Sequence, residues 1–434
     1  MKRAGYAEFK LHSKIRLFAS QIEPEALEQV ERTASMPFVR GVAVMPDVHF
    51  GRGSTVGTVV ATKDAVMPAC VGVDIGCGMI AVRTNLTVES VLPHLRDIRE
   101  GIERRIPLGI GPRGMNSRIL PGAEERIAYL EGQAFAQFDC DVNHMNQRAG
   151  EWRNQLGSLG GGNHFIEVCV GYPVLGPLQH PDLKVGPWLS PDPSVWVILH
   201  SGSRGVGNKT GTFWTKQAQK LATKFLYDKW LPDPDLAYLP VHTDEYHAYM
   251  AELFWCQEFA RCNREEMMDR VLAELYYTCD QKIDPAGSVG SDLPLEAERI
   301  NCHHNYVNRE NHDGENVLVT RKGAIAAAEG DRGLIPGSMG ARSYIVAGLG
   351  HAGAYQSAPH GAGRLMSRTA ARKQFTVEGV RASMEAQGIE ANVREAIVDE
   401  APGAYKDIDA VMWDARELVR PTHRLRQLVS VKGD

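Results

Sequence analysis

The feature that most constrains this chain is the wide spread of its chemically reactive side chains along the sequence. Aspartate, cysteine, histidine and lysine residues stand beside short, glycine-bounded β-like runs, from position 47 to position 432. Side chains that act together must lie together, so segments from nearly the whole chain have to converge on one site. We therefore expect one catalytic domain over residues 1–434 rather than a row of independent domains.

Eight short runs rich in β-branched and aromatic residues predict strands. They cover residues 42–45, 58–62, 79–86, 164–170, 195–200, 317–323, 343–348 and 426–433. Apolar residues spaced three and four apart predict helices over 88–105 and 122–138, and a long helix or helical hairpin over 244–278. We place a helical insertion at about residues 208–281. The Pro- and Gly-rich segment 171–194 predicts a loop.

The composition is that of a soluble globular protein. With 434 residues, of which 43% are hydrophobic and 23% charged, the chain can bury a large core. The first residues lack an apolar signal core, and no run of eighteen apolar residues occurs, so we expect a cytoplasmic protein that does not enter a membrane. The eight cysteines show no regular spacing and predict reduced thiols.

The charge distribution leaves room for a local nucleic-acid contact only. The net charge of -5 gives no overall basic footprint. Between Thr320 and Phe375, however, Glu329 and Asp331 are outnumbered by eight basic residues, namely Arg321, Lys322, Arg332, Arg342, Arg364, Arg368, Arg372 and Lys373. This stretch is a candidate patch for RNA phosphates, the alternative being that its side chains are merely solvated.

A metal site is predicted by residues that recur at strand ends. In "PACVGVDIGCGM" (68–79), glycines let the backbone turn so that Asp74 and Cys77 can aim at one point. Three further motifs, "LGSLGGGNHFIEV" (156–168), "VWVILHSGSRGVG" (195–207) and "RINCHHNYV" (299–307), supply His164, His200, His303 and His304. Each residue alone is typical of a buried or loop position. Together they favour a metal site.

The mixture of donors restricts the metal. Oxygen, imidazole and thiolate ligands fit a borderline ion such as Zn²⁺, Mn²⁺, Co²⁺ or Fe²⁺, and fit Mg²⁺ or Ca²⁺ poorly. Asp74, Cys77 and one histidine from each of the three further motifs, His303 or His304 in the last, make five candidate ligands. Five exceed one tetrahedral centre, which is consistent with two metals that share a thiolate or carboxylate. Asp47 and His49, in "AVMPDVHFGRGSTVG" (43–57), are placed around the ligands or in the substrate groove.

Common catalytic motifs are absent from the sequence. It has no Walker A sequence, no HExxH, no GxSxG, no zinc-deaminase pair and no Lys-x-Asp-Gly. Nucleotidyl transfer, if it occurs, therefore does not use the lysine nucleophile of ordinary nucleotidyl-transferring ligases.

Histidine 360 is a candidate nucleophile. Glycine-rich turns in "EGDRGLIPGSMGARSYIV" (329–346) and "HGAGR" (360–364) are typical of segments that present N–H groups to phosphate oxygens. His360 can attack a phosphorus there while Arg364 neutralises developing charge. The alternative is that His360 only starts a helix and that Arg364 is a solvated helix residue.

The assembled motifs resemble those of the RtcB family of 3′-phosphate RNA-splicing ligases, most of all its bacterial members. The resemblance extends over essentially the whole chain. The motifs recur in the order "MPDVHFGRGSTVG", "GVDIGCGM", "GGGNHFIEV", "LHSGSRG", "NCHHNY", "VTRKGA", "IPGSMGARSYIV", "HGAGRLMSR", "AYKDIDAV" and "VKG". It implies a single α+β domain with a β-sheet core and surrounding helices.

The resemblance also implies roles for individual residues. The implied ligands of two Mn²⁺ ions, with Cys77 bridging, are Asp74, Cys77, His164, His200 and His304. His360 is the implied histidine that becomes guanylylated, with Arg364 at a position implicated in the covalent site. The implied guanine-nucleotide contacts are Asn163, Glu167, Asn305, Ser338, Tyr405 and Lys432.

The implied activity is ligation of an RNA 3′-phosphate, or 2′,3′-cyclic phosphate, to a 5′-hydroxyl with GTP as cosubstrate. We expect a monomer whose partners are these RNA ends and GTP. A dinuclear metallophosphoesterase is the main alternative, but it leaves "HGAGR" without a task. A noncatalytic RNA-binding protein would explain the basic stretch but not the metal ligands.

Overall fold

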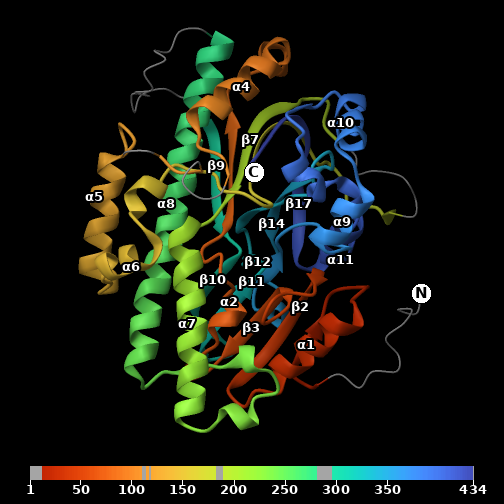
Figure 1. The fold of residues 1–434 in the computed structure, drawn as a ribbon. Coiled ribbons are helices and arrows are strands. Elements are labelled where there is room, and N and C mark those ends of the chain that lie inside the picture. The colour runs from red at the N-terminus through yellow and green to blue at the C-terminus, as the bar shows by residue number, and fades with distance from the viewer. Residues whose placement is uncertain (1–11, 110–113, 117–118, 182–188, 281–295, 434) are drawn as a thin grey trace.

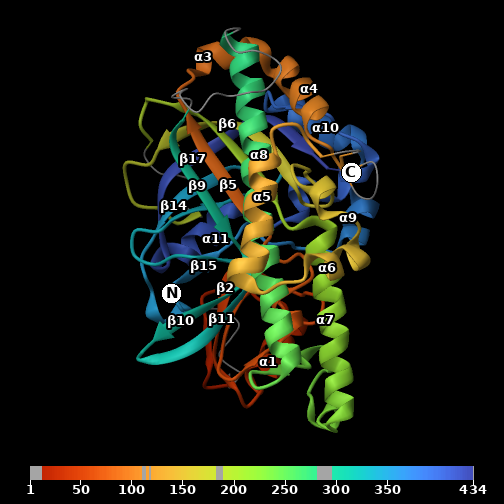
Figure 2. The same ribbon diagram turned by 90° about the vertical axis from the view of Figure 1, so that its left-hand side faces the viewer.

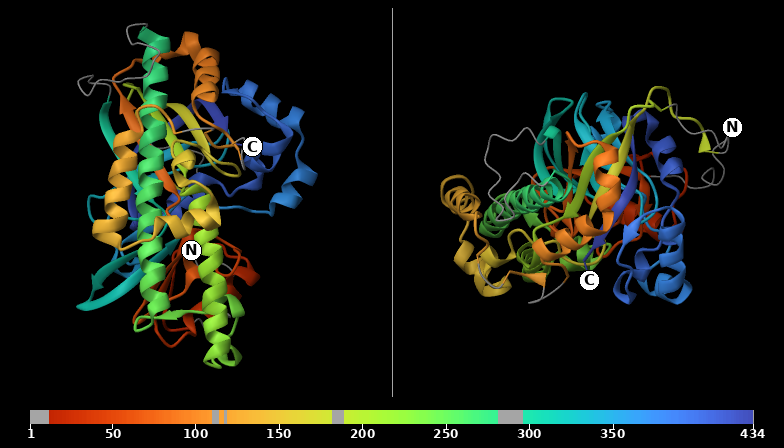
Figure 3. Two further views of the ribbon diagram at one scale, coloured as in Figure 1. Left: turned by 60° about the vertical axis from the view of Figure 1, so that its left-hand side comes forward. Right: turned by 90° about the horizontal axis from the view of Figure 1, so that it is seen from above.

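The computed structural model describes residues 12–109, 114–116, 119–181, 189–280 and 296–433. Within these residues the chain is a single α+β domain built on two main β-sheets (Figure 1). Helices α5, α6, α7 and α8 lie on one side of the sheets, and α9, α10 and α11 lie on the other (Figures 1 and 3). No helix among the described residues is both long enough and apolar enough to cross a membrane.

The larger sheet contains eight strands among the described residues. In spatial order they are β13 (Arg332–Ile335), β14 (Ser343–Gly348), β17 (Val419–Lys432), β6 (Phe165–Pro173), β7 (Ser194–Ser201), β5 (Gly78–Thr84) and β9 (Glu296–His303), with β16 (Glu390–Ala391) beside β17. Neighbours along this order are antiparallel, and β16 pairs with β17 in parallel.

The second sheet contains five strands, in the order β1 (Ile15–Leu17), β2 (Val39–His49), β3 (Val56–Thr62), β11 (Glu315–Lys322) and β10 (Asn305–His312). Two short pairs accompany it: β12 (Ala324–Ala326) with β15 (Ser357–Pro359), and β4 (Ala65–Val66) with β8 (Leu239–Pro240). Only His304 separates β9 of the larger sheet from β10 of the smaller one. The chain therefore passes between the sheets at that histidine.

The helices are α1 (Pro24–Ala34), α2 (Pro68–Val71), α3 (Val88–Val91), α4 (Leu95–Arg105), α5 (Glu124–Gln133), α6 (Val142–Ala149), α7 (Arg204–Lys224), α8 (Asp244–Asp280), α9 (Arg368–Gln374), α10 (Val377–Ala386) and α11 (Ile408–Asp414). A π-helical turn, η3 (Ala134–Phe138), continues α5. Short 3-10 turns are η1 (Leu92–His94), η4 (Trp152–Gln155), η6 (Asp228–Trp230), η7 (Pro234–Leu236), η8 (Ala352–Ala354), η9 (Glu395–Glu400), η10 (Pro402–Ala404) and η11 (Ala415–Glu417).

The central strands of the larger sheet are buried on both faces. One face packs on α4 and α8 (Figure 2). Met267 and Leu275 of α8 belong to the same apolar cluster as Val197 and Leu199 of β7. On the other face, β13 and β14 fold back over β5 and β9, and Arg332 of β13 pairs with a glutamate of β9. This double burial explains why β6 and β7 are nearly continuous apolar runs.

All eight strand predictions are confirmed, since each run overlaps a strand, although the bounds differ by a few residues. The helix predicted over 88–105 is divided into α3, η1 and α4, because Pro93 in η1 lacks an N–H for a continuous ladder. Residues 244–278 lie in one uninterrupted helix, α8, rather than in a hairpin.

Two predicted segments differ in detail from the structure. The predicted loop over 171–194 begins and ends in strands, with a bridge between Val174 and Leu189, and its residues 182–188 lie outside the described part of the chain. Helix α7 begins at Arg204, before the expected start of the helical segment at residue 208. That residues 208–281 are an insertion stays a prediction.

Candidate active site

The predicted site residues meet around one cavity of about 370 Å³, where one end of the larger sheet faces the smaller sheet. This volume lies within the range of roughly 300–1,000 Å³ that is typical of small-molecule sites. Its walls contain all but one of the predicted site residues, namely Asp74, Cys77, Asn163, Glu167, His200, His304, Asn305, Ser338, His360, Arg364, Tyr405 and Lys432. The remaining one, His164, contacts Asp74 and Cys77 directly.

Strand register explains why residues so distant in sequence meet. Lys432 pairs with Phe165, Phe165 with His200, His200 with Met79, and Met79 with Cys302 across five adjacent strands. In this row, β17, β7 and β9 end while β6 and β5 begin. Antiparallel pairing therefore places the residues just beyond these strand ends along one edge of the sheet.

The five predicted metal ligands form two groups that share Cys77. One group contains Cys77, His200 and His304, and the other contains Asp74, Cys77 and His164. Within each group, the nearest ligand atoms lie within 4.8 Å of one another. The Cys77 Sγ atom is 3.2 Å from His200 Nε2 and 3.4 Å from His164 Nε2.

The hydrogen bonds around these histidines fit a cation between the ligand atoms. His164 Nδ1 donates to the Leu159 carbonyl at 2.9 Å, and His200 Nδ1 donates to the Asn163 carbonyl at 3.1 Å. A neutral ring that donates from Nδ1 carries a lone pair on Nε2. The His164 lone pair then faces the Asp74 carboxylate at 3.1 Å. The lone pair on His164 Nε2 and the Asp74 oxygen repel each other at this distance, and a cation between the two atoms would remove the repulsion.

Electrostatics supports the same interpretation. Burial lowers the pKa values of His200 and His304 well below the ordinary range, which keeps both rings neutral and able to act as ligands. Their Nε2 atoms are only 2.8 Å apart. Burial and the Asp74 carboxylate raise the pKa of Cys77 well above its ordinary value. A divalent cation reverses this preference, because it deprotonates a coordinating thiol.

Asn263 and Arg264, on the central part of α8, hold the loops that carry these ligands. Arg264 is fully buried, and its Nη1 donates to the carbonyls of Gly76 at 2.8 Å and Ser201 at 3.1 Å. These residues directly neighbour Cys77 and His200. Asn263 bonds to Ser158 and Gly202, next to the carbonyl that orients His164 and to the end of β7. The sequence did not predict a role at the site for either side chain.

His360 follows β15 and is fixed by the fully buried Asp47 of β2. Its Nδ1 donates to Asp47 Oδ2 at 2.6 Å, and the backbone N–H groups of His360 and Gly361 donate to the same oxygen. The His360 ring centroid is 4.7 Å from that of His304. Gly363 has a φ of 74° and lies so close that a Cβ would be 2.3 Å from the Asp47 carbonyl. Because glycine has no Cβ, Gly363 of "HGAGR" lets the backbone pack directly against the Asp47 carbonyl.

Asp47 and His49 belong to neither ligand group. Their placement around the ligands or in the substrate groove stays a prediction. His49 also lines the cavity, and its Nδ1 lies 2.9 Å from the Asp47 carbonyl. Burial lowers the pKa of His49 to about 4, so this ring is neutral near pH 7.

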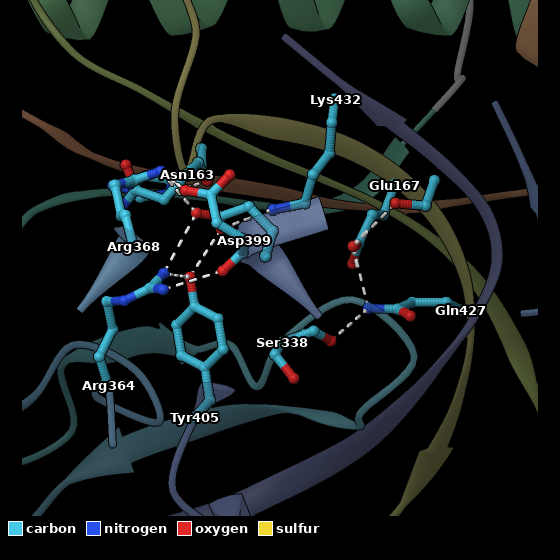
Figure 4. Close-up of polar contacts among 12 residues, drawn as sticks. Asn163, Glu167, Ser338, Arg364, Arg368, Asp399, Tyr405, Gln427 and Lys432 are labelled. Carbon is cyan, nitrogen blue, oxygen red and sulfur yellow. Dashed lines mark hydrogen bonds and ion pairs between the residues drawn. The ribbon is translucent and has the colours of Figure 1, made fainter. Parts of the chain in front are cut away.

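A carboxylate that the sequence did not single out, Glu400, lines one wall of the cavity. It contacts Arg364, Tyr405 and Lys432, which Figure 4 shows gathered on this wall. It pairs with Lys432 Nζ at 3.0 Å and accepts from the Tyr405 hydroxyl at 2.6 Å. Arg364 donates to Tyr405 at 3.0 Å and pairs with Glu400 at 3.3 Å. Burial opposes ionisation of Glu400, but Lys432 and Arg368 lower its pKa to about 2.

Glu167, which pairs with Ser430 of β17 across the sheet, lies on β6 opposite this wall and faces Gln427 of β17 (Figure 4). Its Oε1 accepts from Gln427 at 2.9 Å, and Gln427 also donates to the Ser338 carbonyl at 3.1 Å. Its buried Oε2 has no hydrogen-bond partner among the described residues. Burial raises the pKa of Glu167 to about 7. This wall therefore offers an unused carboxyl oxygen.

Asn163 and Asn305 lie between the ligand loops and the rest of the cavity. Asn163 presents its backbone carbonyl to His200, as described above. Asn305 donates from Nδ2 to the Asp74 carbonyl at 3.3 Å and accepts from the N–H of Gly323 at 2.9 Å. It thereby links the Asp74 loop to the end of β11.

The basic stretch between Thr320 and Phe375 is not one continuous exposed patch, and RNA binding by its exposed members stays a prediction. Arg321 and Lys322 are buried. Lys322 donates to the carbonyls of Arg52, Ser54 and Ala69 in the interior. Arginines of the stretch form ion pairs with acids elsewhere in the chain, as seen for Arg321, Arg332, Arg342, Arg364, Arg368 and Arg372. The count of positive charges in sequence did not reveal these distant partners.

Comparison with known proteins agrees with the motifs. The family model "tRNA-splicing ligase RtcB" matches residues 29–433. The chain is 43% identical over 419 residues to RNA-splicing ligase RtcB of Escherichia coli (strain K12), with 95% of both chains covered. It is 33% identical over 454 residues to the Mycobacterium tuberculosis protein of the same name, covering 93% of this chain and 100% of the relative. It is also 31% identical over 460 residues to tRNA-splicing ligase RtcB of Archaeoglobus fulgidus, covering 95% and 92%. The chain therefore belongs to the RtcB family of tRNA-splicing ligases.

Proposed function

We propose that this protein is an RNA ligase that uses GTP and Mn²⁺ to join an RNA 3′-phosphate to a 5′-hydroxyl. A 2′,3′-cyclic phosphate end is first hydrolysed to the 3′-phosphate at the same site. Family membership supports RNA ligation, and a cavity that combines metal-ligand groups with an anchored histidine supports the chemistry. The cytoplasmic location and the monomeric state stay predictions.

The observation that carries the proposal is the contact between His360 and Asp47. Because His360 Nδ1 donates a hydrogen bond to Asp47 Oδ2 at 2.6 Å, the neutral ring carries its lone pair on Nε2. His360 lines the cavity, beside the His304 ring. A nitrogen nucleophile is therefore held next to the metal-ligand group, which a phosphoesterase that uses only water does not need.

The first step is transfer of GMP to the enzyme. His360 Nε2 attacks the α-phosphorus of GTP, an N–P bond forms, the P–O bond to the β-phosphate breaks, and pyrophosphate leaves. The ring becomes positively charged at this moment, and the Asp47 carboxylate stabilises that charge while fixing the orientation of the ring.

The second and third steps transfer GMP to RNA and seal the ends. An oxygen of the RNA 3′-phosphate attacks the phosphorus on His360, so that the N–P bond breaks and the 3′ end carries a diphosphate-linked guanosine. The 5′-hydroxyl of the second RNA then loses its proton and attacks the 3′-phosphorus, and GMP leaves. His360 is free after the second step and is not consumed.

The metal ligands fit the proposed cofactor. Asp74, Cys77, His164, His200 and His304 would hold two Mn²⁺ ions, with the Cys77 thiolate shared between the two groups. Thiolate and imidazole favour such an ion over Mg²⁺. When bound, the metals act as Lewis acids on phosphate oxygens and lower the pKa of a bound hydroxyl.

The remaining lining residues are proposed to bind the guanine nucleotide. The unpartnered Glu167 Oε2 is an acceptor for N–H groups of a guanine ring. Arg364, Tyr405 and Lys432 already bind the Glu400 carboxylate, so this wall suits anionic or electron-rich atoms of the nucleotide. Asn163, Asn305 and Ser338 complete the contacts from neighbouring loops.

The test separates the role of His360 from that of the metal ligands. With labelled GTP and Mn²⁺, His360→Ala should form no protein–GMP adduct and should not join the RNA ends, because alanine has no nucleophile. Given RNA that already carries a 3′-diphosphate-linked guanosine, the same variant should still seal. Cys77→Ala should fail with both substrates. His247→Ala, an exposed position on α8, is the matched control and should behave as wild type.

Metal content is measured in every variant. A wild-type protein that hydrolyses RNA phosphates but never forms an acid-labile GMP adduct would overturn the proposal in favour of a metallophosphoesterase. A His360→Ala protein that retains its metals yet cannot seal pre-activated RNA would show that the histidine has a structural or later catalytic role.

A further inference from the structure

Helix α7 has a strongly one-sided charge. Five of the 15 lysines of the chain fall between residues 209 and 229, and α7 itself contains no aspartate or glutamate. Lys209, Lys216, Lys220 and Lys224 are all exposed. Their spacings of seven, four and four residues place them in one stripe along the helix. The opposite face, with Trp214 and Ala218 among its members, is buried.

The charge of this stripe is not neutralised by neighbours. Among the residues that the structure describes, no carboxylate pairs with these four lysines, and the one close contact is Lys224 over the Phe225 ring. The arginines of the stretch 320–375 behave in the opposite way, since they pair with acids. The protein therefore carries an uncompensated basic surface on α7 although its net charge is -5.

One end of α7 lies at the cavity. Helix α7 starts at Arg204, four residues after His200. Its second turn packs tightly on the cavity wall, because a Cβ at Gly211 would lie 3.0 Å from Val73 Cα. With 21 residues the helix extends for about 30 Å. Figures 1 and 2 show α7 running from the level of the sheet edge to the lower end of the molecule.

The other end of α7 exposes apolar and aromatic side chains. Phe225 is 59% exposed, Leu226 65% and Trp230 85%. Lys224 and Lys229 flank them. Aromatic rings interleaved with basic residues suit unstacked bases, which bind by stacking while their phosphates contact the cations.

We propose that the lysine stripe of α7 and Trp230 form a surface that binds an RNA strand away from its reacting end. This inference rests on the proposed function. The stripe supplies cations about 10 Å apart between Lys209 and Lys216 and about 6 Å apart from Lys216 to Lys224, and the phosphates of a polyanion can neutralise them. An anionic membrane would also attract lysines. A membrane-bound helix, however, requires exposed apolar residues along its whole length beside the lysines, and here they lie only at one end of the helix.

The main test replaces the four lysines by glutamine in one variant, K209Q/K216Q/K220Q/K224Q. The matched control removes four exposed basic charges elsewhere, in R96Q/R104Q/K373Q/R416Q. Binding of a long single-stranded RNA with a 3′-phosphate is measured over a range of salt concentrations. The stripe variant should lower the magnitude of the slope of log affinity against log salt by about 3, since each lost phosphate contact removes roughly 0.7 to 0.9. The control should leave the slope unchanged.

Further measurements separate the surface from the catalytic site. In the stripe variant, formation of the GMP adduct and ligation of very short RNA ends should stay at the wild-type level, because neither needs the far end of α7. Trp230→Ala should weaken binding of the long RNA by about tenfold through the loss of one stacked base. Failure of the wild type to form any adduct would contradict the proposed function, whereas this inference is decided by RNA binding alone.

Three results would overturn the inference. These are an unchanged salt slope in the stripe variant, an equal fall in the control, and binding of the wild type to vesicles rich in anionic lipid that exceeds its binding to RNA.

Discussion

Replacing Arg264 by methionine is expected to weaken metal binding much more than it weakens the fold. Arg264 lies in the interior of α8 and reaches the carbonyls of Gly76 and Ser201 and the side chain of Asn301. Gly76 and Ser201 each neighbour a proposed metal ligand. Methionine fills a similar volume but donates no hydrogen bond, so both loops lose the group that fixes them.

The magnitude follows from two opposing effects. The buried Gly76 and Ser201 carbonyls and the half-buried Asn301 Oδ1 lose a donor, at up to about 1–3 kcal/mol each, which destabilises the folded state by at most roughly 3–9 kcal/mol. Against this, removal of a buried guanidinium that has no carboxylate partner within the described part of the chain relieves a desolvation penalty of several kcal/mol. The two effects nearly cancel in the free energy of unfolding. They do not cancel in metal affinity, because the guanidinium is buried in both the free and the metal-bound protein.

Metal affinity is therefore expected to fall by about 10- to 100-fold, as for other residues that orient ligands from behind. Free Mn²⁺ is followed by electron paramagnetic resonance during titration, and unfolding is followed by urea denaturation without metal. Arg261→Met is the matched control, since this arginine lies one turn away on α8, is 40% exposed at its side chain and pairs with Glu258. It should leave Mn²⁺ affinity unchanged.

A second variant distinguishes geometry from charge. Arg264→Lys keeps the positive charge, but one ammonium cannot take the place of the guanidinium fork that bonds Asn301, Gly76 and Ser201 together. It should lose affinity nearly as much as Arg264→Met. Wild-type Mn²⁺ affinity in Arg264→Met would refute the reasoning, and full rescue by lysine would show that charge rather than position acts on the site.

Two further predictions concern the cavity walls. Asp47→Asn should slow adduct formation from labelled GTP by about 10²- to 10⁴-fold in single-turnover assays, because the His360 tautomer is no longer fixed by a carboxylate; a rate within twofold of wild type, at equal metal content, would contradict this role. Burial raises the pKa of Glu167 from 4.5 to about 7, so above pH 4.5 the unfolded chain loses a proton that the folded chain keeps, and stability falls toward pH 7. Relative to wild type, Glu167→Gln should therefore gain up to about 3 kcal/mol between pH 5 and pH 8 in urea unfolding; a constant difference would show that the Glu167 carboxyl ionises at its ordinary pH.

Strand positions and the motifs that carry the metal-ligand candidates were predictable because each depends on a local pattern, whereas the choice of His304 over His303 came from the family resemblance. Glycines beside β-branched runs mark strand ends, and the Asp, Cys and His residues stand there. The choice between one long helix and a helical hairpin could also be made from the sequence, because no glycine or proline interrupts residues 244–280 to allow a turn. In contrast, β9 and β10 contain many polar residues, "EAERINCH" and "NYVNRENH", and lack the apolar run that marks a strand.

The positioning residues could not be predicted, because their roles exist only across long separations. Arg264 is one of many charged residues on α8, and no spacing in the sequence connects it to Gly76 or Ser201. Glu400 is likewise inconspicuous until Lys432 and Tyr405 come to lie beside it. For the same reason the sequence did not reveal that much of the basic stretch 320–375 is buried or paired, since its acidic partners are distant in sequence.

The strand order of the larger sheet divides the assembly of the protein into stages. Strands β5, β6, β7 and β9 pair among themselves, and the five metal-ligand candidates lie between residues 74 and 304. Strand β17 lies between β6 and β14 in the sheet and joins them. In the sequence, His360 lies between β14 and β17. During synthesis the ribosome delivers all the metal-ligand candidates before His360 and Lys432. A nascent chain therefore possesses the proposed metal ligands before it possesses the proposed nucleophile, and the candidate site is completed only when β17 joins the sheet.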